Sequence, residues 1–332
     1  MYELLGISVM LAALALLNAF ASLGIAIVWR LSTPLVESFS ARTRADLLFI
    51  LRITAPVLAA ITVAFFLIPS YIGYEPRVTP EIVSKKLAAL AMLSLAGVGF
   101  AVWRGTRSWF ATIRLTKKWL SRSEQIDLAG IDIPTFRIDH SFPIIAIVGT
   151  FRPQLFIARE VLLSLNEEEL AAAIAHECGH LYARDNLKRT LLGICRNTLL
   201  LVPFGRAVDR AWAESAESAA DEFAAQQSRA TALNLASALV TIAKMVPSGA
   251  RAEVPLGAYL VGAETQGVKG RIKRLLEISS HGIHKRTNNP LVRSLPIICL
   301  SGFAVLSVVT ASNAKVLIGV HAIVERAVNL LC

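Results

Sequence analysis

Four long apolar runs constrain this chain more than any other feature of its sequence. They cover residues 4–29, 47–68, 87–103 and 295–312. A helix needs about 20 mostly apolar residues to cross the hydrocarbon core of a bilayer, and each run approaches or exceeds that length. Of the 332 residues, 55% are hydrophobic and only 17% are charged, which is more apolar than an ordinary soluble domain. We therefore expect a mostly α membrane protein with about four transmembrane helices.

Most basic residues lie beside these apolar runs. They follow the third run (residues 104–122), precede the fourth (269–293) and separate the first two (30–44). Basic flanks stay in the cytoplasm, so we expect a multi-pass protein of a bacterial-type inner (plasma) membrane, with the segment between the third and fourth runs in the cytoplasm. Topology also accounts for the net charge of +10. The basic residues cluster beside the apolar runs rather than forming a patch interleaved with stacking aromatics, so no direct nucleic acid binding is expected.

The apolar runs divide the chain into three parts. Residues 1–106 form a membrane domain with three transmembrane helices, residues 107–293 a cytoplasmic α+β domain, and residues 294–332 a fourth transmembrane helix with a short tail. In the middle part, the β-rich residues 135–158 predict a small sheet, and helices are expected over 206–228 and 230–246. The basic and aromatic stretch 107–123 either lies along the membrane surface or continues the third helix. Arg52, inside the second run, is expected to snorkel to the interface.

The stretch "AAAIAHECGHLYARDNLKRT", residues 171–190, carries an HExxH pattern. Asn166 can cap this helix, and Glu169 stands at the capping-box position. Because a helix has 3.6 residues per turn, His176 and His180 fall on one face and can reach a single metal ion. Glu177 lies about 100° around the helix, close enough to take a proton from a water molecule that the metal activates. The pattern also occurs by chance, so the motif alone does not establish a metal site.

A catalytic zinc ion needs a third protein ligand, and the sequence offers three candidates. Glu214, Glu217 and Asp221 are spaced at i, i+3 and i+7 within "RAWAESAESAADEFAA", residues 210–225, and therefore share one helical face. A carboxylate from this face would complete a site with two histidines and one glutamate. The alternative is a solvated acidic face, although apolar neighbours such as Trp212 and Phe223 indicate that the face is only partly exposed.

The segment "LNEEELAAAIAHECGHLYARDN", followed by "ESAADEFAA", resembles the antirepressor-type membrane zinc metallopeptidases, the BlaR and MecR transducers and their relatives. The resemblance covers most of residues 140–278 and implies a gluzincin-like zinc metallopeptidase domain. It implies one zinc ion per chain, held by His176, His180 and Glu217. It also implies that Glu177 is the general base and that Asp221 supports the ligands, and we expect Asp221 to orient a ligand histidine.

Two features depart from that family. About twenty residues follow the fourth run, where the transducers carry a large extracellular sensor. The glycine of "HECGH" and the "AADEFAA" element also resemble the HtpX and CAAX prenyl protease family, which is the alternative. In place of a sensor domain we expect a sensor or regulatory partner protein, docked on an apolar stripe of the tail formed by Val316, Val320, Ile323 and Val324.

These observations predict an integral-membrane zinc-dependent endopeptidase that cleaves cytosolic or membrane-associated proteins, in regulated proteolysis or repressor cleavage. The alternative family implies membrane quality control or processing, and a different class of function is a non-catalytic signalling or scaffold protein with a structural zinc site. We expect the strand Gln154–Ala158 (Gln154, Leu155, Phe156, Ile157 and Ala158) to bind a peptide substrate at an exposed sheet edge. No oxyanion donor is assigned; the nominees are His281, His284 and Tyr259.

Overall fold

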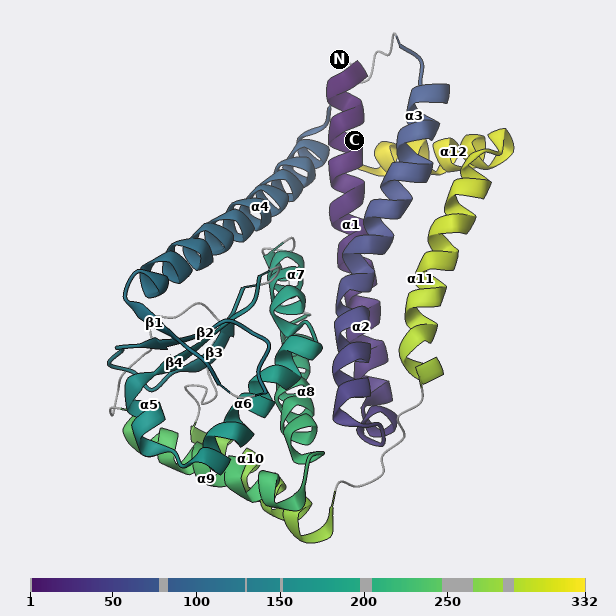
Figure 1. Ribbon diagram of the computed structural model, residues 1–332. Helices are drawn as coiled ribbons and strands as arrows, with labels where there is room; N and C mark the ends of the chain where they lie inside the picture. Colours follow the sequence, from purple (N-terminus) through teal and green to yellow (C-terminus); the bar gives the residue numbers. More distant parts are fainter. Residues whose placement is uncertain are drawn as a thin grey trace.

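The computed structural model describes residues 2–77, 83–128, 130–149, 152–197, 205–246, 265–282 and 290–331. Figure 1 shows a group of long helices beside a smaller body made of a sheet and shorter helices. The long helices are α1 (Tyr2–Glu37), α2 (Ala41–Thr62), α4 (Lys85–Leu120) and α11 (Pro290–Ala311), and α2 continues through a π-helical turn, η1 (Val63–Leu67), into α3 (Ile68–Tyr74). A last helix, α12 (Ala314–Leu331), crosses the end of the bundle that is distant from the sheet.

Four of the described helices are long and apolar enough to cross a membrane. They cover Tyr2–Glu37, Ala41–Tyr74, Lys85–Leu120 and Leu291–Ala311, and they contain the four apolar runs to within one residue at the end of the last. The basic and aromatic stretch 107–123 lies mostly within α4, so it continues the third helix. Because α4 leans away from the bundle, its last turn reaches the sheet, where Trp119 packs against Phe156 with the ring centroids 5.1 Å apart.

The sheet has four strands in the order β1-β2-β4-β3. These are β1 (Ser123–Ile126), β2 (Thr135–Ile138), β3 (Ile145–Val148) and β4 (Gln154–Ala158). Strand β4 pairs with β2 in parallel and with β3 in antiparallel orientation. All four residues of β3 and most of β4 are buried, because this part of the sheet packs against the helices of the smaller body. The edge beside the helices is therefore β3.

Six helices among the described residues belong to the smaller body. They are α5 (Arg159–Ser164), α6 (Glu167–Tyr182), α7 (Asp185–Asn197), α8 (Arg206–Ala225), α9 (Arg229–Met245) and α10 (Thr265–His281). The capping box predicted for α6 is present, because the Asn166 side chain accepts from the Glu169 amide and the Glu169 carboxylate accepts from the Asn166 amide. The helices expected over 206–228 and 230–246 are α8 and α9. Helix α9 fills the core with Leu235, Leu239 and Ile242.

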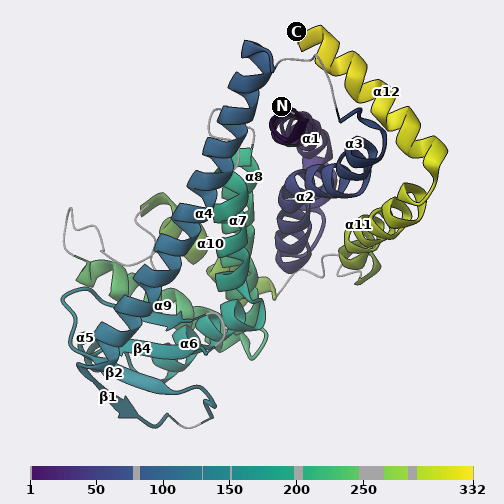
Figure 2. The same cartoon turned by 90° about the horizontal axis from the view of Figure 1, so that it is seen from above.

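Helix α8 joins the smaller body to the second membrane helix. On α8, Val208, Trp212 and Ala216 form one buried cluster with Ala45 and Leu48 of α2. Figure 2 shows α7 and α8 between α4 and the α1–α2 pair, and α8 contacts α2 along this face. The candidate metal ligand Glu217 and its neighbour Asp221, both on α8, are therefore fixed relative to α2.

Arg52 does not snorkel to the interface as its position in the sequence suggested. Its side chain is only 6% exposed, and its Nε donates to Asp209 Oδ1 of α8 over 3.1 Å. Gly205, before the first turn of α8, makes this possible, because a Cβ there would lie 2.4 Å from Arg52 Nε. A buried ion pair to a partner helix was available, and it satisfies the charge without a route to water.

Removing one member of this pair should cost more stability than removing both. Asp209→Leu leaves the buried Arg52 guanidinium without its partner and should destabilise the protein by about 3–5 kcal/mol. The double variant Arg52→Met, Asp209→Leu replaces the pair by apolar groups and should recover most of that loss. Thermal unfolding in detergent measures both. Equal midpoints for wild type and Asp209→Leu would mean that the pair contributes nothing.

Candidate metal centre

Helix α6 presents the two motif histidines on one face. The ring centroids of His176 and His180 lie 4.8 Å apart, and His176 is fully buried. Helix α8 approaches this part of α6 closely, since a Cβ on Gly179 would lie only 3.1 Å from the Ala220 Cα. The glycine of "HECGH" thus allows α8 to bring Glu217 to the histidines.

The three side chains leave a gap of the size that a zinc ion requires. His176 Nε2 lies 3.7 Å from Glu217 Oε2, and His180 Nε2 lies 3.5 Å from Glu217 Oε1. These distances exceed those of hydrogen bonds. Ligands about 2.1 Å from a tetrahedral zinc ion lie roughly 3.4 Å from one another. His176, His180 and Glu217 therefore fit a zinc site with an open fourth position.

Each histidine is oriented by a carboxylate behind it. His176 Nδ1 lies 2.9 Å from Asp221 Oδ1, and His180 Nδ1 lies 2.8 Å from Asp185 Oδ2. A carboxylate that accepts a hydrogen bond from Nδ1–H fixes the tautomer in which Nε2 carries no proton and can bind a metal ion. Arg184, with a φ of 53°, turns the chain between α6 and α7 so that Asp185 reaches back to His180. Asp221 thus takes the orienting position expected of it, and Asp185 has the same position on the second ring.

Two arginines pair with the carboxylates of the centre, and sequence reasoning missed both. Arg271 of α10 donates from Nε and NH2 to the two Asp221 oxygens over 3.0 and 2.7 Å, and its NH1 lies 3.2 Å from Glu217 Oε2. Arg189 of α7 donates to Glu217 Oε1 over 3.1 Å. For Arg271 the sequence offered one signal, the basic run "VKGRIKRLLE". Residue spacing cannot reveal that Arg271 contacts Asp221, which lies fifty positions earlier.

These contacts keep the carboxylates charged. Burial by itself raises the pKa of Asp221, but Arg271 and the bond with His176 lower it to about 2. Burial also acts to raise the pKa of Glu217, yet His180 and Arg271 hold it well below its usual range. Burial lowers the pKa of His180, but Glu217 and Asp185 raise it to about 9. Asp221 and Glu217 are therefore ionised at neutral pH, and a metal ion that bound His180 would displace its proton.

Glu177 lies between the histidines and the sheet edge. It is only 6% exposed, and its Oε2 accepts from the Ile147 amide of β3 over 3.4 Å. The Ile147 carbonyl accepts from the Asn186 side chain over 3.0 Å. Main-chain groups of β3 therefore face the centre, next to the candidate base.

The strand expected to bind substrate is not an edge. Strand β4, which holds Gln154, Leu155, Phe156, Ile157 and Ala158, has β2 on one side and β3 on the other, so its main-chain groups are already paired. The edge that faces the centre is β3. Ala158 donates to the Ile144 carbonyl. Because bonding alternates along an antiparallel pair, Ile145 and Ile147 direct their main-chain groups away from β4.

The remaining nominees do not join the centre. Glu214 is exposed, and it is not part of the group formed by His176, His180 and Glu217. His281 is at the end of α10, where its ring contacts Ser280, while Tyr259 and His284 lie outside the described residues. Cys178 is partly buried beside the core, and burial together with Glu177 raises the pKa of its thiol, which fits packing.

Glu217→Ala should remove zinc from the purified protein, whereas Glu214→Ala should leave about one ion per chain. Only Glu217 faces both imidazoles, and Glu214 provides an exposed control on the same helix. Asp221→Ala should weaken zinc affinity by about 10- to 100-fold, as the loss of a ligand's orienting partner does. Competition with a chromogenic chelator measures the affinities. A larger loss from Glu214→Ala would show that the third ligand is misassigned.

Comparison with known families agrees with this chemistry. Residues 146–281 match the sequence model of peptidase family M48. The matched segment includes α6 with its two histidines, all of α8, and α10 with Arg271. No curated protein matches the chain. The match supports a metallopeptidase of the M48 family, whose members depend on zinc, and it does not confirm the antirepressor subtype.

Proposed function

We propose that the chain is an integral-membrane zinc endopeptidase in which His176, His180 and Glu217 bind the metal and Glu177 is the general base. The observation that carries the proposal is the fit of two imidazoles and one carboxylate to a zinc ion, with a second carboxylate directly beside them. A purely structural zinc site needs ligands but no base. The presence of Glu177 therefore favours a peptidase over a scaffold protein.

The residues of the centre have separate tasks in this mechanism. When bound, zinc activates water and polarises the scissile carbonyl. Glu177 takes a proton from the attacking water and returns it to the leaving amine. Asp185 and Asp221 hold the histidines in the tautomer that binds metal. His180 and Arg271 hold the pKa of Glu217 well below its usual range, so that this carboxylate is available as a metal ligand and does not compete as a base.

The substrate is proposed to bind as an extended strand along β3. Ile145 directs its main-chain groups to this edge, beside Ile147, whose amide and carbonyl already bond Glu177 and Asn186. A peptide that pairs with β3 would run past the general base and the two histidines, which is the geometry of strand addition.

The substrate class follows from the proposed topology. Basic flanks favour a cytoplasmic position for residues 107–293, so the substrates are cytosolic proteins or the cytoplasmic parts of membrane proteins. Repressor cleavage, as in the antirepressor-type family, and HtpX-like quality control or processing both fit this class. The contact between α8 and α2 favours substrates that are presented at the membrane, because the centre is held beside it.

Glu177→Gln tests the mechanism. The variant should lower turnover by about 100- to 10,000-fold, because an amide cannot accept the proton. It should keep its zinc, since the ligands are unchanged and glutamine can still accept from Ile147. Cleavage of a fluorogenic peptide library and metal content measure the two properties, with Glu214→Gln as the exposed control. Full turnover in Glu177→Gln would refute the mechanism, and zinc without turnover in wild type would favour a structural site.

Ile145→Pro tests the edge strand. Proline removes an amide that points away from β4, which edge strands tolerate, and it also replaces a fully buried isoleucine side chain, which lowers stability. The Michaelis constant of the folded variant should rise at least several-fold, while its zinc content stays near wild type and its unfolding midpoint falls. Ile145→Val, which keeps the amide and most of the volume, should resemble wild type. Unchanged kinetics in folded Ile145→Pro would exclude this part of β3 from substrate binding.

A further inference from the structure

A second group of metal-binding side chains lies at the opposite end of the bundle. Glu75 directly follows α3, while His321 and Glu325 stand one turn apart on α12. Figure 1 shows α3 and α12 meeting at the end of the bundle that is farthest from the sheet. The group therefore belongs to a different part of the molecule from the centre on α6 and α8.

The donor spacing in this group matches that of the candidate metal centre. His321 Nε2 lies 3.8 Å from Glu75 Oε2 and 3.6 Å from Glu325 Oε1. The corresponding distances at the first centre are 3.7 and 3.5 Å. A charged hydrogen bond would close to about 2.8 Å. In both groups one carboxylate and one imidazole nitrogen instead stand apart by the distance that a shared metal ion requires.

The surrounding contacts hold two of the three donors in place. The side chain of Glu75 is 8% exposed and that of His321 is 14% exposed, whereas Glu325 is half exposed. Helix α12 is fixed on α3 because Ser70 Oγ donates to the Leu317 carbonyl over 2.9 Å. The Tyr74 ring also lies beside the His321 ring. Preorganised donors on two elements lose little conformational freedom when an ion joins them.

We propose that Glu75, His321 and Glu325 form a second metal site, which binds a divalent transition-metal ion, with zinc as the best match. One imidazole and two carboxylates are ligands that suit zinc, whereas magnesium and calcium prefer oxygen alone. The exposed side of Glu325 leaves coordination positions for water. Because the site shares no residue with the first centre, it does not depend on the proposed peptidase activity.

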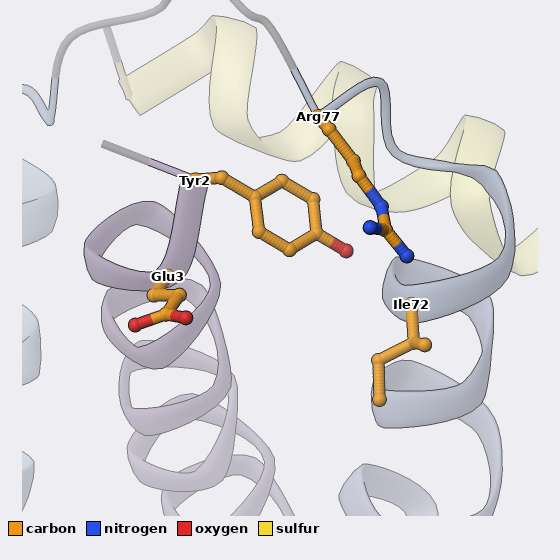
Figure 3. Close-up of a pocket in the computed structure, with 4 residues that line it drawn as sticks. All are labelled: Tyr2, Glu3, Ile72 and Arg77. Carbon is orange, nitrogen blue, oxygen red and sulfur yellow. The ribbon is translucent and has the colours of Figure 1, made fainter.

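An ion at this site would join α12 to the bundle. Val324 and Val328 of α12 already pack against Leu5 and Leu87, so the apolar stripe expected to dock a partner protein is used in part within the chain. A cavity of about 560 Å³ opens at the same end, lined by Tyr2, Glu3, Ile72 and Arg77 (Figure 3).

Metal counting on the full chain in detergent tests the proposal. The protein is stripped with a chelator, dialysed against buffered zinc, and measured by mass spectrometry of the metal. Wild type should hold two ions per chain. His321→Ala and Glu325→Gln should each hold one, His180→Ala should lose the other ion, and the nearby control Glu3→Gln should keep both. In a His180→Ala background, zinc should still raise the unfolding temperature, and adding His321→Ala should abolish that rise.

The outcomes separate this site from the peptidase centre. A single ion in wild type, lost in His180→Ala and kept in His321→Ala, would overturn the second site and leave the first intact. Two ions in both His321→Ala and Glu325→Gln would also overturn it. If His321→Ala fails to fold, Glu325→Gln decides, because its half-exposed side chain can change without disturbing the packing.

Discussion

The packing of α8 against two partners is the constraint on which the rest of the structure depends. One face of α8 lies on α2 through Val208, Trp212 and Ala216, and another meets α6 where Gly179 permits close approach to Ala220. Glu217 and Asp221 are on the same helix, so their distance to the histidines is set by both contacts. A close-packed interface does not deform smoothly. A shift of α2 would therefore change the position of Glu217 relative to His176 and His180.

A chain of charges provides a second connection from α2 to the centre. Asp46 of α2 accepts from Lys188 of α7 over 2.6 Å and also pairs with Arg42 and Arg293. Lys188 lies 3.9 Å from Asp185, which in turn holds His180. One ligand histidine is thus connected to the membrane helix through side chains, and Glu217 is connected to it through the packing of α8. The two paths reach different ligands from the same helix.

Local patterns predicted the parts of the centre that lie on single helices. The i, i+4 spacing placed His176 and His180 on one face, and the position of Asp221 behind His176 agrees with the orienting role expected of it. What could not be predicted depends on contacts distant in the sequence. The strand order places β4 inside the sheet. Arg271 of α10 pairs with Asp221 of α8, and Arg52 of α2 pairs with Asp209 of α8, and both contacts join residues distant in the sequence. Hydropathy correctly located the four long apolar helices. It does not reveal that a charged residue inside one of them, Arg52, pairs with a carboxylate of another helix.

The buried charges explain why such distant residues belong to one centre. A carboxylate that orients a histidine must remain ionised while buried, and this requires a cation or a donor beside it. Asp221 has Arg271, Asp185 has Lys188 at longer range, and Glu217 has both arginines. Arg189 and Arg271 come from α7 and α10, whereas the carboxylates of Glu217 and Asp221 are on α8. Lys188 lies one turn after Asp185 on the same helix, α7. The proposed metal binding would therefore depend on the assembly of α6, α7, α8 and α10, and, through the ion pairs of Asp46 and Arg52, on α2 as well.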